Sequence, residues 1–222
     1  FDGQRVTMAS QMSEADETVS SLYSVKSEQA TMLSFDTYNY LVHYFGQPQG
    51  SMSDDPNGTL GGDYEFIISS ASAERIELKG KKYGNRIVMK ALTEDQTWKQ
   101  YLTKIKKVED DAFFYEYDLL MDGLYTGQML RSNYTFIVTY YDEIGKVHQK
   151  TVPFMFTADG MRFHEPVTID GQTMQNFVWK NEVISFVCTD EGATGSNWRV
   201  STLPDIKAMI IIRALIRWIF TA

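Results

Sequence analysis

Short segments of alternating apolar and polar residues, separated by turns that contain Asp and Gly, constrain the fold of this chain more than any other feature. Between residues 112 and 190 these segments are AFFYEYDLL, NYTFIVTYY, KVHQKTVPFMF, MRFHEPVTI, QNFVWK and VISFVCTD, and the turns include DEIG, ADG and IDG. A period of two is the pattern of a strand with one buried face, and such turns are strong hairpin signals. The sequence therefore predicts an antiparallel meander over residues 112–190.

Residues 19–92 carry the same kind of pattern, in the segments LYSVK, MLSFDTYNYLVHYF, DYEFIISS, RIELKG and RIVMK. They predict a first meander, interrupted by a loop at 47–62 that is rich in Gly, Ser, Asp and Pro. Aromatic residues make up 14% of the chain, which also favours strands.

An amphipathic helix is predicted between the two meanders, over residues 94–109. Thr93 and Gln96 have the spacing of a capping box, which favours a helix start at this point. The apolar residues that follow fall on one helical face, through which we expect the helix to dock on a sheet: Trp98, Tyr101, Leu102, Ile105 and Val108.

The predicted fold class is therefore mainly β, with antiparallel meanders packed as a sandwich or as a partly open barrel. We expect a single β-rich unit over 1–222. Residues 201–222 form an atypical apolar tail, which we expect to be either a buried helix or a truncated or foreign end. Its longest apolar run, 206–220, is too short to span a bilayer and contains Arg213 and Arg217.

A basic segment, LKGKKYGNRIVMK at 78–90, stands out because the formal net charge of the chain is −8. As a hairpin it would place Ile76, Leu78, Ile87 and Met89 toward a core and the charges outward. It lacks the spacing of a phosphate-binding loop. Two interpretations stay open: a solvated face that discourages edge-to-edge aggregation, or an anion-binding site formed by Lys79, Lys81 and Arg86. General nucleic-acid binding is not expected for so acidic a chain.

Aromatic residues that follow Leu33 change parity, because Phe35 groups with Leu33 whereas Tyr38 and Tyr40 face the opposite way. A bulge or a strand buried on both sides would explain the change. Tyr38, Tyr40 and Tyr44 are the candidate ligand-binding residues, since exposed tyrosine rings stack on sugars or contact proteins, although packed core aromatics are the alternative.

Few residues point to catalysis or metal binding. The sequence SDDPNG at 53–58 resembles the start of a calcium loop, but Ser53 and Tyr64 stand where two main ligands are needed. The three histidines lack metal-ligand spacing, so neither a metal nor a cofactor is expected. Cys188 lies in an apolar run and is expected to be a buried, inert thiol rather than a nucleophile. No catalytic residue is therefore proposed from the sequence.

The ordered segments LSFDTYNYLVHYF, GDYEFIISS and RIELKGKKYGNRIVM, followed by the helix at Trp98, resemble an uncharacterised family of lipoproteins from gut and oral Bacteroidetes, a domain of unknown function. The resemblance covers roughly residues 20–190. It implies an exported protein at the outer membrane or cell surface, attached only by a lipid anchor on an acylated cysteine upstream of Phe1. The chain would then be a mature or cut fragment of that protein.

These observations favour a non-enzymatic ligand- or partner-binding domain at the cell envelope, with a role in nutrient capture. The expected partner is a glycan, a peptide or an envelope protein. One alternative is a glycan or peptide hydrolase with an unrecognised carboxylate pair. The other is a structural or adhesive module without a small ligand.

Overall fold

The computed structural model describes residues 1–27, 29–48, 59–92, 97–142 and 144–201. Two compact units divide the chain, unit 1 over residues 1–103 and unit 2 over residues 104–222. The predicted fold class is confirmed: the structure is mainly antiparallel β, with an amphipathic helix between two β sections. The single β-rich unit over 1–222 stays a prediction.

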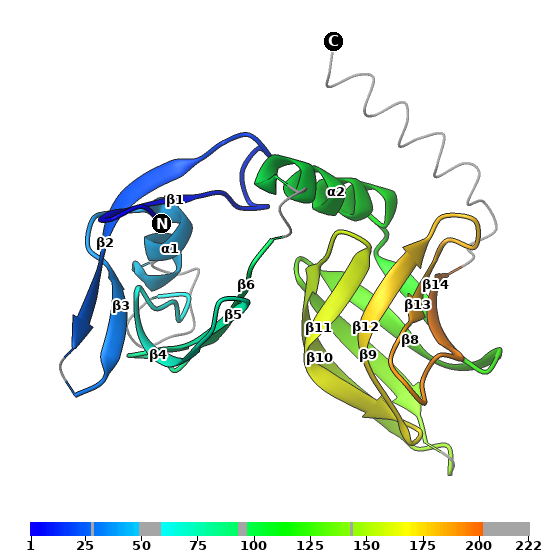
Figure 1. Ribbon diagram of the computed structural model, residues 1–222. Helices are drawn as coiled ribbons and strands as arrows, with labels where there is room; N and C mark the ends of the chain where they lie inside the picture. The colour runs from blue at the N-terminus through cyan, green and yellow to red at the C-terminus, as the bar shows by residue number, and fades with distance from the viewer. Residues whose placement is uncertain (28, 49–58, 93–96, 143, 202–222) are drawn as a thin grey trace. The chain divides into compact units, whose positions relative to one another are not determined.

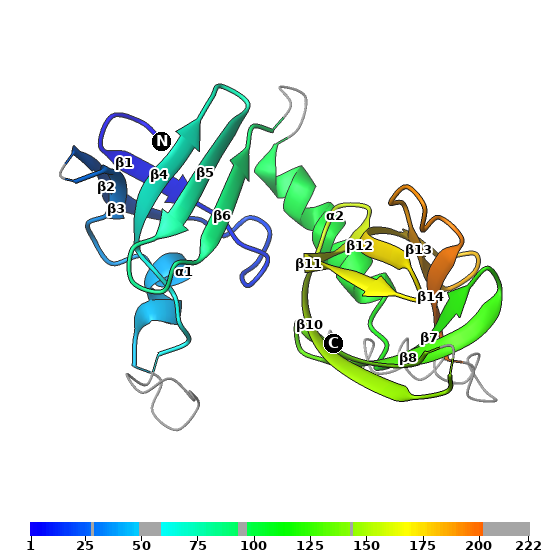
Figure 2. The same cartoon turned by 90° about the horizontal axis from the view of Figure 1, so that it is seen from below.

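Unit 1 contains an antiparallel sheet whose strands follow one another in chain order (Figures 1 and 2). The strands are β1 (Arg5–Met8), β2 (Val19–Ser27), β3 (Thr31–Phe35), β4 (Glu65–Ala71), β5 (Arg75–Gly80) and β6 (Arg86–Lys90). Successive side chains of a strand point to opposite faces of the sheet, so every second residue lies on the inner face. The buried core on this face consists of Val6, Leu33, Phe35, Phe66 and Leu78. Ile76 and Met89 pack against this core, as predicted for the basic hairpin.

The chain after β3 becomes helical, where the sequence was expected to continue as a strand. Helix α1 (Tyr40–His43) is followed by the short 3₁₀ helix η1 (Tyr44–Gly46). Fully buried Asn39 caps α1: its side chain accepts a hydrogen bond from Leu41 N–H (3.1 Å) and donates one to Ser21 Oγ (3.1 Å). The predicted two-sided burial is confirmed for β3, where four successive residues, Met32 to Phe35, are buried. The predicted bulge is absent from the pairing of β3, and the change of parity at Tyr38 and Tyr40 comes from the end of the strand and the helical turn.

Unit 2 contains a closed antiparallel barrel (Figures 1 and 2). Its strands are β7 (Glu116–Met121), β8 (Leu124–Ser132), β9 (Thr135–Tyr141), β10 (Val147–Phe156), β11 (Gly160–Ile169), β12 (Gln172–Lys180), β13 (Ser185–Cys188) and β14 (Ser196–Val200). The last strand pairs with the first, with Trp198 opposite Leu119 and Val200 opposite Tyr117. Because β14 lies beyond the predicted meander at 112–190, the closing strand was missed, and the barrel is closed rather than partly open.

Large apolar side chains fill the barrel interior, as an eight-stranded barrel allows. Phe136 and Phe154 stack with ring centroids 4.0 Å apart, and Trp198 has no exposed surface. The largest fully buried side chains of the described residues all belong to unit 2: Trp198, Tyr117, Phe136, Phe154, Phe156, Phe163, Phe186, Leu119, Met129, Met161, Ile169 and Met174. The interior is therefore a packed core that holds the barrel together.

Helix α2 (Trp98–Asp111) begins with a capping box at Thr97 and Gln100. Thr97 N–H donates to Gln100 Oε1 (3.0 Å), and Gln100 N–H donates to Thr97 Oγ1 (3.3 Å). The predicted pair, Thr93 and Gln96, lies outside the described residues. Trp98 is 42% exposed, so its predicted docking is wrong. It occupies the first helical position, ahead of the segment whose side chains are buried.

The C-terminal half of α2 lies across one end of the barrel (Figure 1). Ile105 and Val108 are buried, whereas Glu109 and Asp111 reach the turns between strands. Glu109 accepts a hydrogen bond from Tyr134 Oη (3.2 Å), and Asp111 accepts one from Asn181 Nδ2 (3.3 Å). The amphipathic pattern of the sequence therefore positions the helix as a cover for this end.

The calcium-like segment at 53–58 lies outside the described residues, and so does the predicted apolar tail apart from Ser201. Among the helices that the structure describes, none combines the length and the apolar character needed to cross a bilayer.

Candidate functional site

A pocket of about 320 Å³ opens in unit 1, where the chain after α1 meets the start of β4 and the turn between β5 and β6. Its lining consists of Gly46, Gly62, Asp63, Tyr64, Glu65, Lys81, Lys82 and Tyr83. The volume falls at the lower end of the range of small-molecule sites. The pocket joins two regions that the sequence analysis treated separately, the aromatic segment and the basic hairpin.

Buried Asp63 holds the basic turn against the start of β4. Its carboxylate accepts hydrogen bonds from the backbone N–H groups of Lys82 (2.7 Å) and Tyr83 (3.1 Å) and from Asn85 Nδ2 (3.0 Å). Glycine is required at position 80, because a Cβ atom there would collide with the Asp63 carboxylate. Asp63 thus shapes the pocket wall and orients the side chains of the turn.

Aromatic rings form a second group beside the pocket. The ring of Tyr64 stacks on that of His43, with centroids 4.9 Å apart and planes inclined by 13°. Tyr38 lies on His43 with centroids 5.4 Å apart. Because Tyr64 lines the pocket and is 46% exposed, part of a ring that His43 holds in place faces solvent there. Such a ring can stack on the apolar face of a ligand.

Charges around the pocket balance one another. Lys81 Nζ lies 3.0 Å from Glu65 Oε2, and Lys82 Nζ lies 4.6 Å from the centroid of the Tyr83 ring. The hydroxyl of Tyr83 is 2.8 Å from Thr59 Oγ1. With Asp63 and Glu65 opposing Lys81 and Lys82, the lining residues have no net charge. This composition suits an uncharged polar ligand better than a strongly charged one.

The three tyrosines proposed from the sequence do not form one platform. Tyr38 is 59% exposed and joins the His43–Tyr64 group. Tyr40 donates a hydrogen bond to Glu17 Oε1 (2.6 Å), and this bond raises the pKa of its phenol. Tyr44 is 38% exposed and makes an edge contact with Phe45. Their ligand-binding role stays a prediction, and none of the three lines the pocket.

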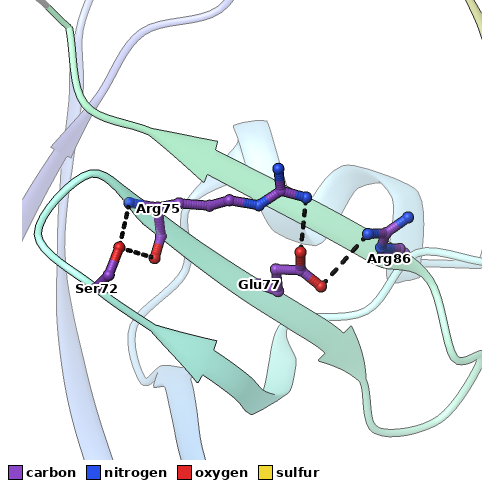
Figure 3. Close-up of polar contacts among 4 residues, drawn as sticks. All are labelled: Ser72, Arg75, Glu77 and Arg86. Atoms are coloured by element: carbon purple, nitrogen blue, oxygen red, sulfur yellow. Dashed lines mark hydrogen bonds and ion pairs between the residues drawn. The ribbon is translucent and has the colours of Figure 1, made fainter.

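The three residues of the proposed anion site are also divided. Lys81 lines the pocket, whereas Lys79 and Arg86 are opposite one another on the outer face of β5 and β6. Figure 3 shows Glu77 on this face between Arg75 and Arg86, whose Nη2 atoms lie 2.6 and 3.3 Å from its carboxylate oxygens. The hydrogen bond from Arg75 is the main cause that lowers the pKa of Glu77. Anion binding by Lys79, Lys81 and Arg86 stays a prediction.

Side chains with catalytic chemistry occur elsewhere in structural roles. Burial raises the pKa of Cys188 to about 11, so its thiol is protonated at neutral pH, as expected for an inert cysteine. His148 Nε2 lies 2.8 Å from Asp142 Oδ2 in the hairpin between β9 and β10, a pair that the sequence analysis missed. Within the described ranges, no group of three or more His, Cys, Asp or Glu side chains could hold a metal ion.

An arginine at the covered end of the barrel is nearly as buried as the core. The side chain of Arg131 is 7% exposed and lies 3.4 Å from Glu109 Oε1 of α2. Its Nε donates to the carbonyl of Asn133 (3.0 Å), and its guanidinium lies 4.7 Å from the centroid of Phe113 and 5.1 Å from that of Phe156. These contacts attach α2 to the barrel, which is a structural role.

Comparison with known proteins finds a match to one protein family. A protein-family model described as a domain of unknown function, DUF4302, matches residues 1–181, a span that includes the pocket and most of the barrel strands. No curated protein and no solved structure matches the chain.

Proposed function

Because the chain belongs to the DUF4302 family, a domain of unknown function, we propose a function from its structure: it is a non-enzymatic binding domain that holds a small, uncharged glycan in the pocket of unit 1. The observation that carries the proposal is the exposed ring of Tyr64, fixed by its stack on His43, beside balanced polar groups. Sugars present apolar ring faces and many hydroxyl groups, so both kinds of contact would be used.

Two of the segments that carry the family resemblance supply most of the pocket lining, with Asp63 to Glu65 in the second segment and Lys81 to Tyr83 in the third. The first segment contains His43, whose ring stacks on the pocket residue Tyr64. On the basis of that resemblance, the proposal places the parent protein among the lipoproteins of Bacteroidetes, anchored by lipid at the cell envelope and engaged in nutrient capture. Labelling of the full-length parent with a fatty acid, followed by fractionation of membranes, tests this part separately.

A hydrolase is the less favoured alternative, although two carboxylates, Asp63 and Glu65, line the pocket. Asp63 accepts hydrogen bonds from two backbone N–H groups and one side-chain amide, and Glu65 pairs with Lys81. A general acid or base must instead reach the reacting atoms of the substrate. The arrangement favours binding over bond cleavage, and a structural or adhesive module would need no pocket.

A glycan-binding screen followed by titration in solution tests the proposal. Tyr64→Ala removes the exposed ring and should weaken binding by about tenfold, the equivalent of one aromatic contact. Tyr125→Ala is the matched control, because Tyr125 is 57% exposed on the barrel. Equal effects of the two substitutions, or the absence of any bound glycan, would refute the site. Release of reducing sugar from a bound glycan would instead identify a hydrolase.

A further inference from the structure

Strand β6 forms one edge of the sheet in unit 1. Within the described residues it pairs with β5 alone, and Figure 2 shows it at the outer side of the hairpin. An edge strand presents a row of backbone N–H and C=O groups that another strand can bind.

Hydrogen bonds at the two ends of the β5–β6 ladder fix its phase. Gly80 N–H donates to the carbonyl of Asn85 (2.7 Å), and Ala91 N–H donates to the carbonyl of Glu74 (3.1 Å). Opposite residues in an antiparallel pair alternate between hydrogen-bonded and non-hydrogen-bonded pairs. Gly80 with Asn85 and Glu74 with Ala91 are therefore both hydrogen-bonded pairs. They are six positions apart in the register, so both give the same alternation for the pairs between them.

Counting along the register from these ends, Ile87 and Met89 direct their N–H and C=O groups toward β5. Arg86, Val88 and Lys90 fall in the alternate pairs and direct theirs away from the sheet. None of these three residues makes another backbone hydrogen bond within the described ranges. The edge thus offers three consecutive sets of main-chain donors and acceptors to an added strand.

The side chains of these same residues lie on the cationic face of the hairpin. Val88 is 38% exposed and separates Arg86 from Lys90. The residues opposite Arg86, Val88 and Lys90 are Lys79, Glu77 and Arg75, respectively. Figure 3 shows that the carboxylate of Glu77 is held by Arg75 and Arg86, so four basic side chains face a single acidic one on this surface.

Pairing with β6 of a second copy is disfavoured in the register that uses all three outward-facing residues. Antiparallel self-pairing centred on Val88 would place Arg86 of each copy opposite Lys90 of the other, and like charges directly opposite destabilise a strand pair. A strand with acidic residues at those two positions would make the contacts favourable.

We propose that the β6 edge binds, as an added antiparallel strand, an extended segment of a partner protein that has an acidic, an apolar and an acidic residue at alternate positions. Strand addition supplies main-chain hydrogen bonds at Arg86, Val88 and Lys90, and the alternate side chains select the partner. The acidic residues face Arg86 and Lys90, and the apolar residue covers Val88. This surface is separate from the glycan pocket, and the inference does not depend on it.

The test uses the full chain and the peptide TETVTET, which as an antiparallel strand places its two Glu residues opposite Arg86 and Lys90 and its Val opposite Val88. Amide chemical shifts should change along β6 and at its cross-strand neighbours. Methylation of the peptide nitrogens of Glu, Val and Glu should weaken binding by about tenfold or more, because these N–H groups face β6. Methylation of the intervening Thr nitrogens, whose N–H groups face away, provides the matched control and should have a smaller effect.

Charge selection is tested with the double variant R86E/K90E and the peptide TKTVTKT. The original protein should prefer TETVTET and the variant should prefer TKTVTKT, while thermal unfolding shows that the variant is folded. Tyr64→Ala should leave peptide binding unchanged. Equal effects of the two methylation patterns would show attraction between charges without strand addition and would overturn the proposal. Failure of TETVTET to bind would also overturn it and would leave the charges as protection against aggregation.

Discussion

Removing the carboxylate of Asp63 should loosen the turn that forms one wall of the pocket. Asp63→Ala leaves the N–H groups of Lys82 and Tyr83 and the amide of Asn85 without this acceptor. A hydrogen bond to a charged group contributes about 1.5–3 kcal/mol when its partners are buried. Lys82 and Asn85 are exposed, so water can hydrogen-bond to their freed N–H groups and offset part of the lost free energy. We therefore expect the free energy of unfolding to fall by about 3 kcal/mol in total, less than three full contributions.

Urea unfolding followed by circular dichroism measures this change, and hydrogen exchange at the Lys82 and Tyr83 amides measures it locally. Asp63→Asn keeps one carbonyl oxygen and should lose only about 1 kcal/mol, as for a neutral acceptor. Asp16→Ala is the control, because the Asp16 side chain is 67% exposed and its ion pair with Lys99 should contribute about 0.5 kcal/mol or less. Similar stability and similar amide exchange in Asp63→Ala and Asp16→Ala would show that the Asp63 carboxylate does not hold the turn.

Three further predictions concern individual side chains. Cys188, with a pKa raised to about 11, should react with a thiol reagent at neutral pH only after unfolding, and rapid labelling of the folded chain would contradict its burial. The lowered pKa of Glu77 means that its contribution to stability is present above its unfolded pKa and is lost as pH falls through the folded value; an NMR titration should show a lower midpoint, which Arg86→Gln should raise. Trp98→Ala should reduce the free energy of unfolding by about 1 kcal/mol, against about 2–5 kcal/mol for Leu102→Ala, because Trp98 is 42% exposed and Leu102 is 8% exposed. Urea unfolding compares the two variants, and a larger loss for Trp98→Ala would show that the indole contributes more than its exposure indicates.

Hairpin turns could be predicted from the sequence because their chemistry is local. Asp170 and Gly171, in the predicted IDG turn, have φ angles of 46° and 73° between β11 and β12. Asp122 and Gly123 have φ angles of 49° and 82° between β7 and β8, but this turn and strand β8 were missed in the sequence. Asp and Gly tolerate these left-handed conformations better than other residues do. The order and direction of neighbouring strands follow directly from such turns.

Features that depend on distant contacts could not be predicted in this way. The helical turn at Tyr40 follows a run of residues that favour strands, and it forms where buried Asn39 reaches Ser21 on another strand. The pocket brings Tyr64 and Lys81 together from segments separated in the chain, and His43 stacks on Tyr64 beside it. No local sequence pattern indicates that these residues lie close together. The candidate tyrosines and lysines chosen from the sequence therefore only partly coincide with the residues around the pocket.

Pairing between β14 and β7 brings the two ends of the barrel's strand order together. Val200 lies opposite Tyr117, and Ser201 N–H donates to the carbonyl of Glu116 (3.1 Å), so the point where the last strand ends adjoins the point where the first begins. A short peptide link could therefore join them in a chain that begins at another hairpin, such as Asp170–Gly171, with loss of the covalent connection between α2 and β7. Circular permutants of this kind would retain every strand neighbour, and the barrel should tolerate them because its ring of hydrogen bonds is independent of the order of synthesis.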